Sequence, residues 1–246
     1  MRTWLPVEDT FTDFVRGFGG QVVSDLLGPS PNHPNADYFF PSVQVVAELK
    51  CLTDDKREDA GIQQKVQQLF DRWMEDGTIP VMYGDNIRID SKSLPERCQR
   101  EIYEAYKPPI QRRIIKANKQ IKATAERLRL TQYVGLLLLV NDGNYALESS
   151  SILYQVWRVL GNQFRHINNV LYFTVNMTAT SPRTVEPTLV WARASRKSLP
   201  SAPDEFLEAL WTGWRAHFQM VTGVPVSEVR LSGIEDLEHV RYSADA

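Results

Sequence analysis

Apolar residues in the first part of the chain recur every three or four positions. Between residues 11 and 27 this period predicts an amphipathic helix, which Gly28-Pro29 ends. The Gly19-Gly20 pair lies near the middle of that stretch, where each glycine costs a helix about 1 kcal/mol relative to alanine. The same period returns between residues 61 and 76, which predicts a second amphipathic helix.

The rest of the chain contains patterns typical of β-strands, with further helices between them. The solid apolar run 133–140 predicts a strand buried on both faces, and a helix at 152–160 followed by a strand at 170–175 completes a β-α-β succession. The residues from 178 to 184 look like a loop. The remaining predicted elements are strands at 36–40, 43–52, 79–83, 86–90 and 188–194, and helices at 110–129 and 203–221. Together they predict an α/β fold.

Composition limits the classes of protein that need to be considered. The 246 residues are 43% hydrophobic and 24% charged, which suits one large globular domain without a composition shift that would mark a linker. The net charge is −2, so any contact with nucleic acid must come from local clusters of lysine and arginine. The four histidines show no metal-ligand spacing, and we interpret them as surface or packing residues; the two cysteines have no C-x-x-C spacing.

The sequence contains no segment suited to a membrane. Its first six residues include no long apolar stretch, and the run Val134–Val140 is too short to cross a bilayer. We therefore expect a cytoplasmic protein in which Cys51 and Cys98 stay reduced.

The second predicted strand, 43–52, has an apolar face and a face that carries charged side chains. Its odd-numbered residues are all apolar, which makes their face the natural core side. Glu48 and Lys50 lie side by side on the other face. If the strand pairs with 36–40 so that partner numbers add up to 83 or 85, Asp37 comes to the same face, diagonal to Glu48 or opposite it. A shift by one residue would send Asp37 to the other face.

Asp37, Glu48 and Lys50 form a chemically suggestive set. Two carboxylates at that distance repel unless a cation lies between them, and hard divalent ions prefer oxygen ligands. An adjacent ammonium group can orient a water molecule or neutralise charge on phosphate oxygens. The alternative is a solvated ion pair on an exposed strand face, because the Glu-x-Lys pattern alone is common.

These residues resemble a known family motif. Asn35-Ala36-Asp37 followed by Ala47-Glu48-Leu49-Lys50 is similar to the PD-(D/E)xK nuclease superfamily, and so is the order of helix, strand hairpin, helix and β-α-β over about residues 8–176. Ala36 stands where the family name has proline. The resemblance implies a restriction-endonuclease-like mixed central sheet flanked by helices, with residues 177–246 as a C-terminal helical extension packed on a core of residues 1–176.

The resemblance also implies roles for individual residues. Asp37 and Glu48, helped by the backbone carbonyl of Leu49, would bind Mg²⁺, for which Mn²⁺ would substitute. Lys50 would position the attacking water. An additional acid on the leading helix is a further candidate ligand, and Glu8 is the first choice, although acids also favour the first turn of any helix.

Cations concentrate on the predicted helix 110–129. Phosphate contacts from such groups supply most nonspecific affinity for nucleic acid, whereas a solvated helix face is the alternative explanation. Lys116, Lys119 and Gln120 share one side of the helix and are the best candidates to approach the scissile backbone. The cations of this stretch, opposed by Glu126 alone, are Lys107, Arg112, Arg113, Lys116, Lys119, Lys122, Arg127 and Arg129.

Tryptophans gather near the C-terminus. Trp211 and Trp214 have helical spacing with other apolar residues, so we interpret them as core rather than as a platform for stacking bases. An exposed apolar stripe at this place would instead indicate a dimer surface.

The sequence thus favours a magnesium-dependent endonuclease that cuts DNA, in a restriction or phage-defence setting where a partner protein, a modified-base filter or an activation step controls it. A second copy of the chain, as a homodimer, or a regulatory protein is the expected protein partner. Cleavage of RNA stays open. Two other functions compete: a module of the same fold that binds nucleic acid or protein without cutting, and a structural subunit that uses the Trp-rich tail.

Overall fold

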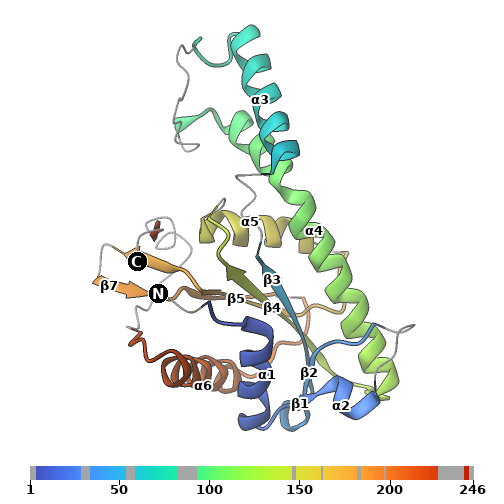
Figure 1. The fold of residues 1–246 in the computed structure, drawn as a ribbon. Coiled ribbons are helices and arrows are strands. Elements are labelled where there is room, and N and C mark those ends of the chain that lie inside the picture. Colours follow the sequence, from blue (N-terminus) through green and yellow to red (C-terminus); the bar gives the residue numbers. More distant parts are fainter. Residues whose placement is uncertain are drawn as a thin grey trace.

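The structure is a computed structural model. It describes residues 4–28, 34–53, 59–81, 93–145, 148–161, 163–181, 184–196, 198–226 and 241–243. The chain forms an α/β protein built on a six-stranded mixed sheet (Figure 1). None of the helices in these ranges is long and apolar enough to cross a membrane.

The central sheet has the strand order β1-β2-β3-β4-β5-β8. The three middle strands run parallel, whereas β1, β2 and β8 are antiparallel to their neighbours. A separate three-stranded sheet has the order β7-β6-β9. The strands are β1 (Gln21–Val22), β2 (Tyr38–Phe40), β3 (Val45–Leu52), β4 (Val134–Asp142), β5 (Asn169–Val175), β6 (Thr178–Ser181), β7 (Thr184–Thr188), β8 (Trp191–Ser195) and β9 (Arg241–Ser243).

Helices cover both faces of the central sheet. α1 (Val7–Gly17) and α6 (Asp204–Thr222) pack on one face, and α4 (Glu96–Arg127) and α5 (Ser149–Leu160) pack on the other. β4 is apolar on both sides because it lies between these two layers, as its solid hydrophobic run predicts.

β3 follows the predicted alternation, with one difference. Val45, Ala47 and Leu49 pack beneath α1 and α6, as the odd-numbered face requires. The opposite face is not solvated, because Val46 packs into the layer of α4 and α5. Glu48 therefore lies on a covered face and is fully buried.

The leading helix is shorter than predicted. α1 ends at Gly17, and the chain then forms β1 and a short helix, α2 (Val23–Leu27). The single helix predicted between residues 11 and 27 is therefore wrong. Gly19 adopts a φ of +88°, and a side chain at Gly20 would come within 2.7 Å of the Phe40 ring, so the glycines turn the chain closely against β2.

The basic helix is longer than predicted. α4 begins at Glu96 and continues through Pro108 and Pro109, although each interior proline costs a helix about 3 kcal/mol. Tertiary packing overrides this cost, since Pro109 is buried and the Gln155 side chain of α5 donates to the Tyr103 carbonyl of α4 at 2.9 Å. The predicted start at residue 110 is therefore wrong.

The two small strands predicted at 79–83 and 86–90 are not supported where the structure describes them. Residues 79–81 form no strand, and residues 82–92 lie outside the described residues. The loop predicted at 178–184 is also wrong in part, because residues 178–181 form β6.

The C-terminal residues belong to the main fold. β8 pairs with β5, with Trp191 opposite Phe173, and α6 buries Trp214 completely. The Trp214 ring lies 4.9 Å from the Phe11 ring between centroids. The interpretation of Trp211 and Trp214 as core residues is confirmed, because both are buried.

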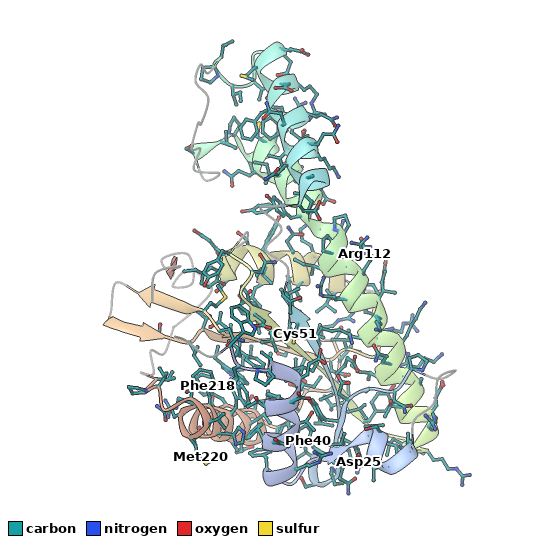
Figure 2. All side chains as sticks on the ribbon, viewed as in Figure 1. Asp25, Phe40, Cys51, Arg112, Phe218 and Met220 are labelled. Carbon is teal, nitrogen blue, oxygen red and sulfur yellow. The ribbon has the colours of Figure 1, made fainter. Side chains whose placement is uncertain are left out.

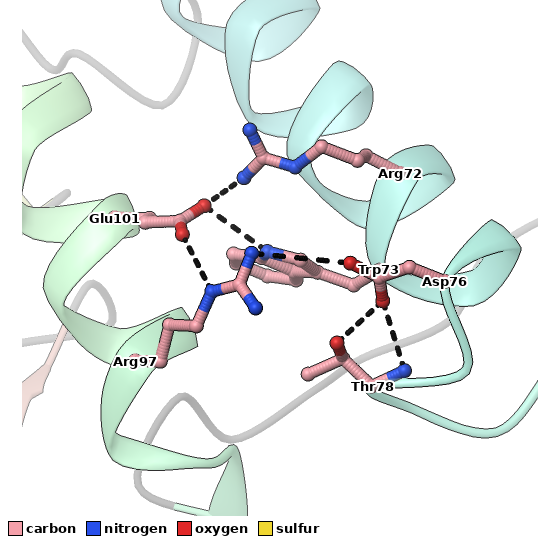
Figure 3. A network of polar contacts seen from close by, with 6 residues as sticks. All are labelled: Arg72, Trp73, Asp76, Thr78, Arg97 and Glu101. Atoms are coloured by element: carbon pink, nitrogen blue, oxygen red, sulfur yellow. Dashed lines mark hydrogen bonds and ion pairs between the residues drawn. The ribbon is translucent and has the colours of Figure 1, made fainter.

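A helical arm extends beyond the sheet (Figure 1). It consists of α3 (Ala60–Glu75), which Asp59 caps, and the first half of α4. Trp73 is the centre of its small core and donates its ring N–H to Glu101 at 3.1 Å. Arg72 and Arg97 also bond to Glu101, so one carboxylate ties the two helices together (Figure 3).

Candidate active site

The β2–β3 hairpin has one of the two registers that bring the acidic residues together. Tyr38 pairs with Ala47, and Phe40 pairs with Val45, so partner numbers add up to 85. The next position continues that series and puts Asp37 beside Glu48. A 3₁₀ turn, Pro41–Val43, followed by Gln44 with a φ of +51°, closes the hairpin at its other end.

Asp37 is held by the backbone of β3. Its Oδ2 accepts a hydrogen bond from the Leu49 amide at 2.8 Å, and its own carbonyl accepts one from the Val23 amide at 2.9 Å. The side chain is half-buried. The carboxylate therefore points toward β3 with one oxygen already engaged.

Glu48 is completely shielded from solvent, and only one of its oxygens has a partner. The Lys50 ammonium contacts Oε1, whereas Oε2 makes no hydrogen bond to any described residue. Lys50 itself keeps 14% of its side chain exposed. When Glu48 is ionised, this oxygen has no donor to offset its burial, so a cationic ligand would stabilise it; when Glu48 is protonated, the neighbouring Asp37 carboxylate can accept its proton.

Electrostatics in this cluster raise the pKa values of both acids when no cation is bound. Burial and the negative charge of Asp37 raise the pKa of Glu48 to about 8, although Lys50 opposes the shift. Burial also raises the pKa of Asp37, against the stabilising Leu49 amide and the Lys50 charge. Two adjacent carboxyls that resist ionisation together are the arrangement that a divalent cation stabilises.

The donor set fits a hard divalent ion. Mg²⁺ is usually bound by one or two carboxylates and completes its coordination with water. The Leu49 N–H points to Asp37, and the carbonyl of a strand residue projects to the same side as its N–H, so the Leu49 carbonyl faces the same space. Among the described residues, no three histidine, cysteine or acidic side chains converge closely enough to hold a metal. Asp37 and Glu48 would therefore supply both side-chain ligands.

Glu8 lies near the cluster without joining it. It is exposed on the first turn of α1, and its charge contributes to raising the pKa values of Asp37 and Cys51. This influence places the Glu8 carboxylate within electrostatic range of the site. The described structure does not bring it into a ligand set with the other two acids.

The six predicted nucleic-acid contacts on α4 separate into three groups. Arg112, Lys116 and Lys119 are exposed and form no ion pair within the described ranges. Lys122 is exposed but lies 3.7 Å from Glu126, one helical turn away.

The other two predicted contacts face the protein. Arg113 donates to the Cys51 carbonyl at 3.0 Å, directly after Lys50 in β3. Gln120 is buried and donates to the Asn35 carbonyl at 2.7 Å. Gln120 therefore faces the sheet, whereas Lys116 and Lys119 face solvent. The prediction that all three share one exposed side of the helix is wrong for Gln120.

α4 runs directly beside the site. Arg113 contacts the end of β3 and Gln120 contacts the segment before β2, and seven residues of helix span about 10 Å. Lys116 and Lys119 lie between these two anchors. Arg112 on α4 and Cys51 on β3 lie near the same end of the sheet (Figure 2).

Thr124 makes a contact next to the site that the sequence pattern does not reveal. The hydroxyl of Thr124, buried on α4, accepts a hydrogen bond from the Ala36 amide at 2.6 Å. The pattern of α4 offered no signal for it, since a threonine among basic residues looks like part of a solvated face.

Comparison with protein-family models, with curated proteins and with solved structures found no match.

Proposed function

We propose that this chain is a metal-dependent endonuclease that hydrolyses phosphodiester bonds in DNA, on a restriction-endonuclease-like fold of the PD-(D/E)xK type. One observation carries the proposal. Asp37 and Glu48 converge from adjacent strands next to Lys50, and a buried oxygen of Glu48 has no partner within the described chain.

Each residue has a distinct role in this proposal. Asp37 and Glu48 would hold Mg²⁺ or Mn²⁺, and the Leu49 carbonyl would assist them. When bound, the ion supplies Lewis-acid catalysis and neutralises charge on phosphate oxygens. Lys50 exchanges its contact with Glu48 for the attacking water, which its ammonium group orients toward phosphorus.

The surface of α4 supports a polyanionic substrate. Arg112, Lys116 and Lys119 are exposed, without ion pairs in the described ranges, on the helix that flanks the site. Arg72 and Arg97 of the arm are instead engaged, since both pair with Glu101, whereas Lys65 is exposed there. The three cations of α4 are those that lie on the helix beside the acidic pair.

The decisive experiment measures cleavage and metal binding in parallel. Supercoiled plasmid, single-stranded DNA and RNA are incubated with Mg²⁺ or Mn²⁺ and with wild type, Glu48→Gln or Lys50→Ala. We expect both variants to lose about 10²-fold or more in cleavage rate. Calorimetry should show metal binding lost in Glu48→Gln and retained in Lys50→Ala.

Glu101→Gln serves as the control. It removes an ion-paired, partly buried carboxylate from the arm, away from the site, and should cleave like wild type. Cleavage that survives both Glu48→Gln and Lys50→Ala would reject the proposed site. Nucleic-acid binding without cleavage by wild type would identify a binding module, and cleavage of RNA alone would correct the substrate.

A further inference from the structure

The position of Asp37 is not fixed by strand pairing alone. β2 has only three residues, and its pairing with β3 starts at Tyr38, so Asp37 lies just outside the ladder. A ligand carboxylate at the end of a short strand needs other contacts to keep its geometry. Those contacts come from α4.

Two buried side chains of α4 form hydrogen bonds with the backbone of the two residues before Asp37. The Thr124 hydroxyl accepts the Ala36 N–H at 2.6 Å, and the Gln120 amide donates to the Asn35 carbonyl at 2.7 Å. Thr124 is completely buried and Gln120 is 7% exposed, so water does not compete for either bond. Arg127 adds a contact to the Asn35 side chain.

These bonds limit the rotation available to Asp37. Backbone atoms on its N-terminal side are held by α4, its carbonyl is held by Val23, and its carboxylate is held by the Leu49 amide. Thr124 and Gln120 lie four residues apart, one helical turn, which is why both reach the same dipeptide.

We infer that Thr124 and Gln120 are positioning residues, which act through Asn35 and Ala36 to hold Asp37 in a metal-binding geometry. The part of this inference that concerns metal rests on the proposed function. Residues that orient a ligand from behind typically change metal affinity about 10–100-fold when they are replaced.

α4 thereby carries both the exposed lysines proposed to contact phosphate and the buried side chains that hold the segment before Asp37. Lys116 and Lys119 are exposed on the same helix whose buried side holds the segment before Asp37. A phosphate group bound by Lys116 and Lys119 would therefore be held by the same helix that holds the segment before Asp37.

The chain supplies closely matched controls. Thr174 is also completely buried, and its hydroxyl accepts the Val190 N–H at 2.9 Å, two strands away from β3. Gln155 is also buried and donates to a backbone carbonyl of α4 at 2.9 Å, at Tyr103 in its first half. Replacing either residue removes the same kind of bond without touching the segment before Asp37.

The test compares Mn²⁺ affinity among Thr124→Val, Thr124→Ser and Gln120→Leu, with Thr174→Val and Gln155→Leu as controls. We expect Thr124→Val and Gln120→Leu to weaken binding about tenfold, and Thr124→Ser and both controls to stay within about threefold of wild type. Rescue by serine separates a role of the hydroxyl from a general loss of packing.

A second measurement is independent of metal. Hydrogen exchange of the Leu49 amide reports whether the Asp37 carboxylate still accepts its bond. We expect faster exchange at Leu49, relative to neighbouring amides of β3, in Thr124→Val and unchanged exchange in Thr174→Val.

The possible outcomes are distinguishable. If Asp37→Asn abolishes Mn²⁺ binding while Thr124→Val and Gln120→Leu bind like wild type, the inference is overturned and the proposed function stands. If wild type binds no Mn²⁺, the proposed function fails, and Leu49 exchange alone decides: acceleration in Thr124→Val supports the positioning role, and unchanged exchange overturns it.

Discussion

Replacing Glu48 by glutamine should change how the stability of the metal-free protein depends on pH. The pKa of Glu48 is raised to about 8 in the folded protein, because the side chain is buried and lies beside Asp37, whereas its ordinary value is 4.5. An acid with a raised pKa stabilises the folded state below its ordinary pKa. That contribution is lost as pH rises from about 4.5 to about 8.

The size of this effect follows from the difference between the two pKa values. One unit corresponds to about 1.4 kcal/mol, so the difference between 4.5 and about 8 sets an upper limit of about 5 kcal/mol. Asp37 titrates together with Glu48, and its own raised pKa contributes in the same direction. We therefore expect the wild type to lose roughly 3 kcal/mol more than Glu48→Gln between pH 5 and pH 8.

The assay is urea unfolding at several pH values in the presence of a chelator. Titration of His166, whose pKa is lowered by burial, has the opposite sign and is common to both proteins, so it cancels in the comparison. Adding Mg²⁺ at about 100 times its Kd should restore roughly 3 kcal/mol to wild type at pH 8 and nothing to the variant. Equal pH dependence in the two proteins would refute the proposed electrostatics of the site.

Three further predictions concern other parts of the molecule. Replacing both Lys116 and Lys119 by alanine should weaken DNA binding and reduce the slope of log affinity against log salt by about 2, measured by fluorescence anisotropy; an unchanged slope would exclude α4 from phosphate contact. Trp214→Ala should lower the free energy of unfolding by about 3–5 kcal/mol, because Trp214 is completely buried, whereas Trp157→Ala should cost far less since Trp157 is 49% exposed. Glu101→Ala should cost about 1–3 kcal/mol and speed hydrogen exchange in α3, because the buried ring N–H of Trp73 loses its acceptor; unchanged exchange there would contradict the role assigned to Glu101.

The part of the site that could be predicted from sequence depends on a local rule. Side chains alternate along a strand, so Glu48 and Lys50 had to share a face, and a short hairpin left only a few registers for Asp37. The solid apolar run of β4 likewise predicted its own burial, because no polar position was available to face water.

Other features were decided by contacts between distant residues. α4 continues through two prolines because α5 packs against it, and the helix of residues 11–27 breaks because Gly20 packs directly against Phe40. Local helix propensity does not include either contact. The sequence therefore predicted a start for α4 that is too late, and a helix over residues 11–27 that is too long.

The same distinction applies to the candidate site. The sequence by itself determined which acidic and basic side chains share a strand face, because this follows from their spacing along the strand. Only the tertiary structure decided that Glu48 is shielded from water, that Gln120 faces inward and that Thr124 holds Ala36. The physical reason is that burial and hydrogen bonding between elements far apart in the chain depend on packing, which no period along the sequence encodes.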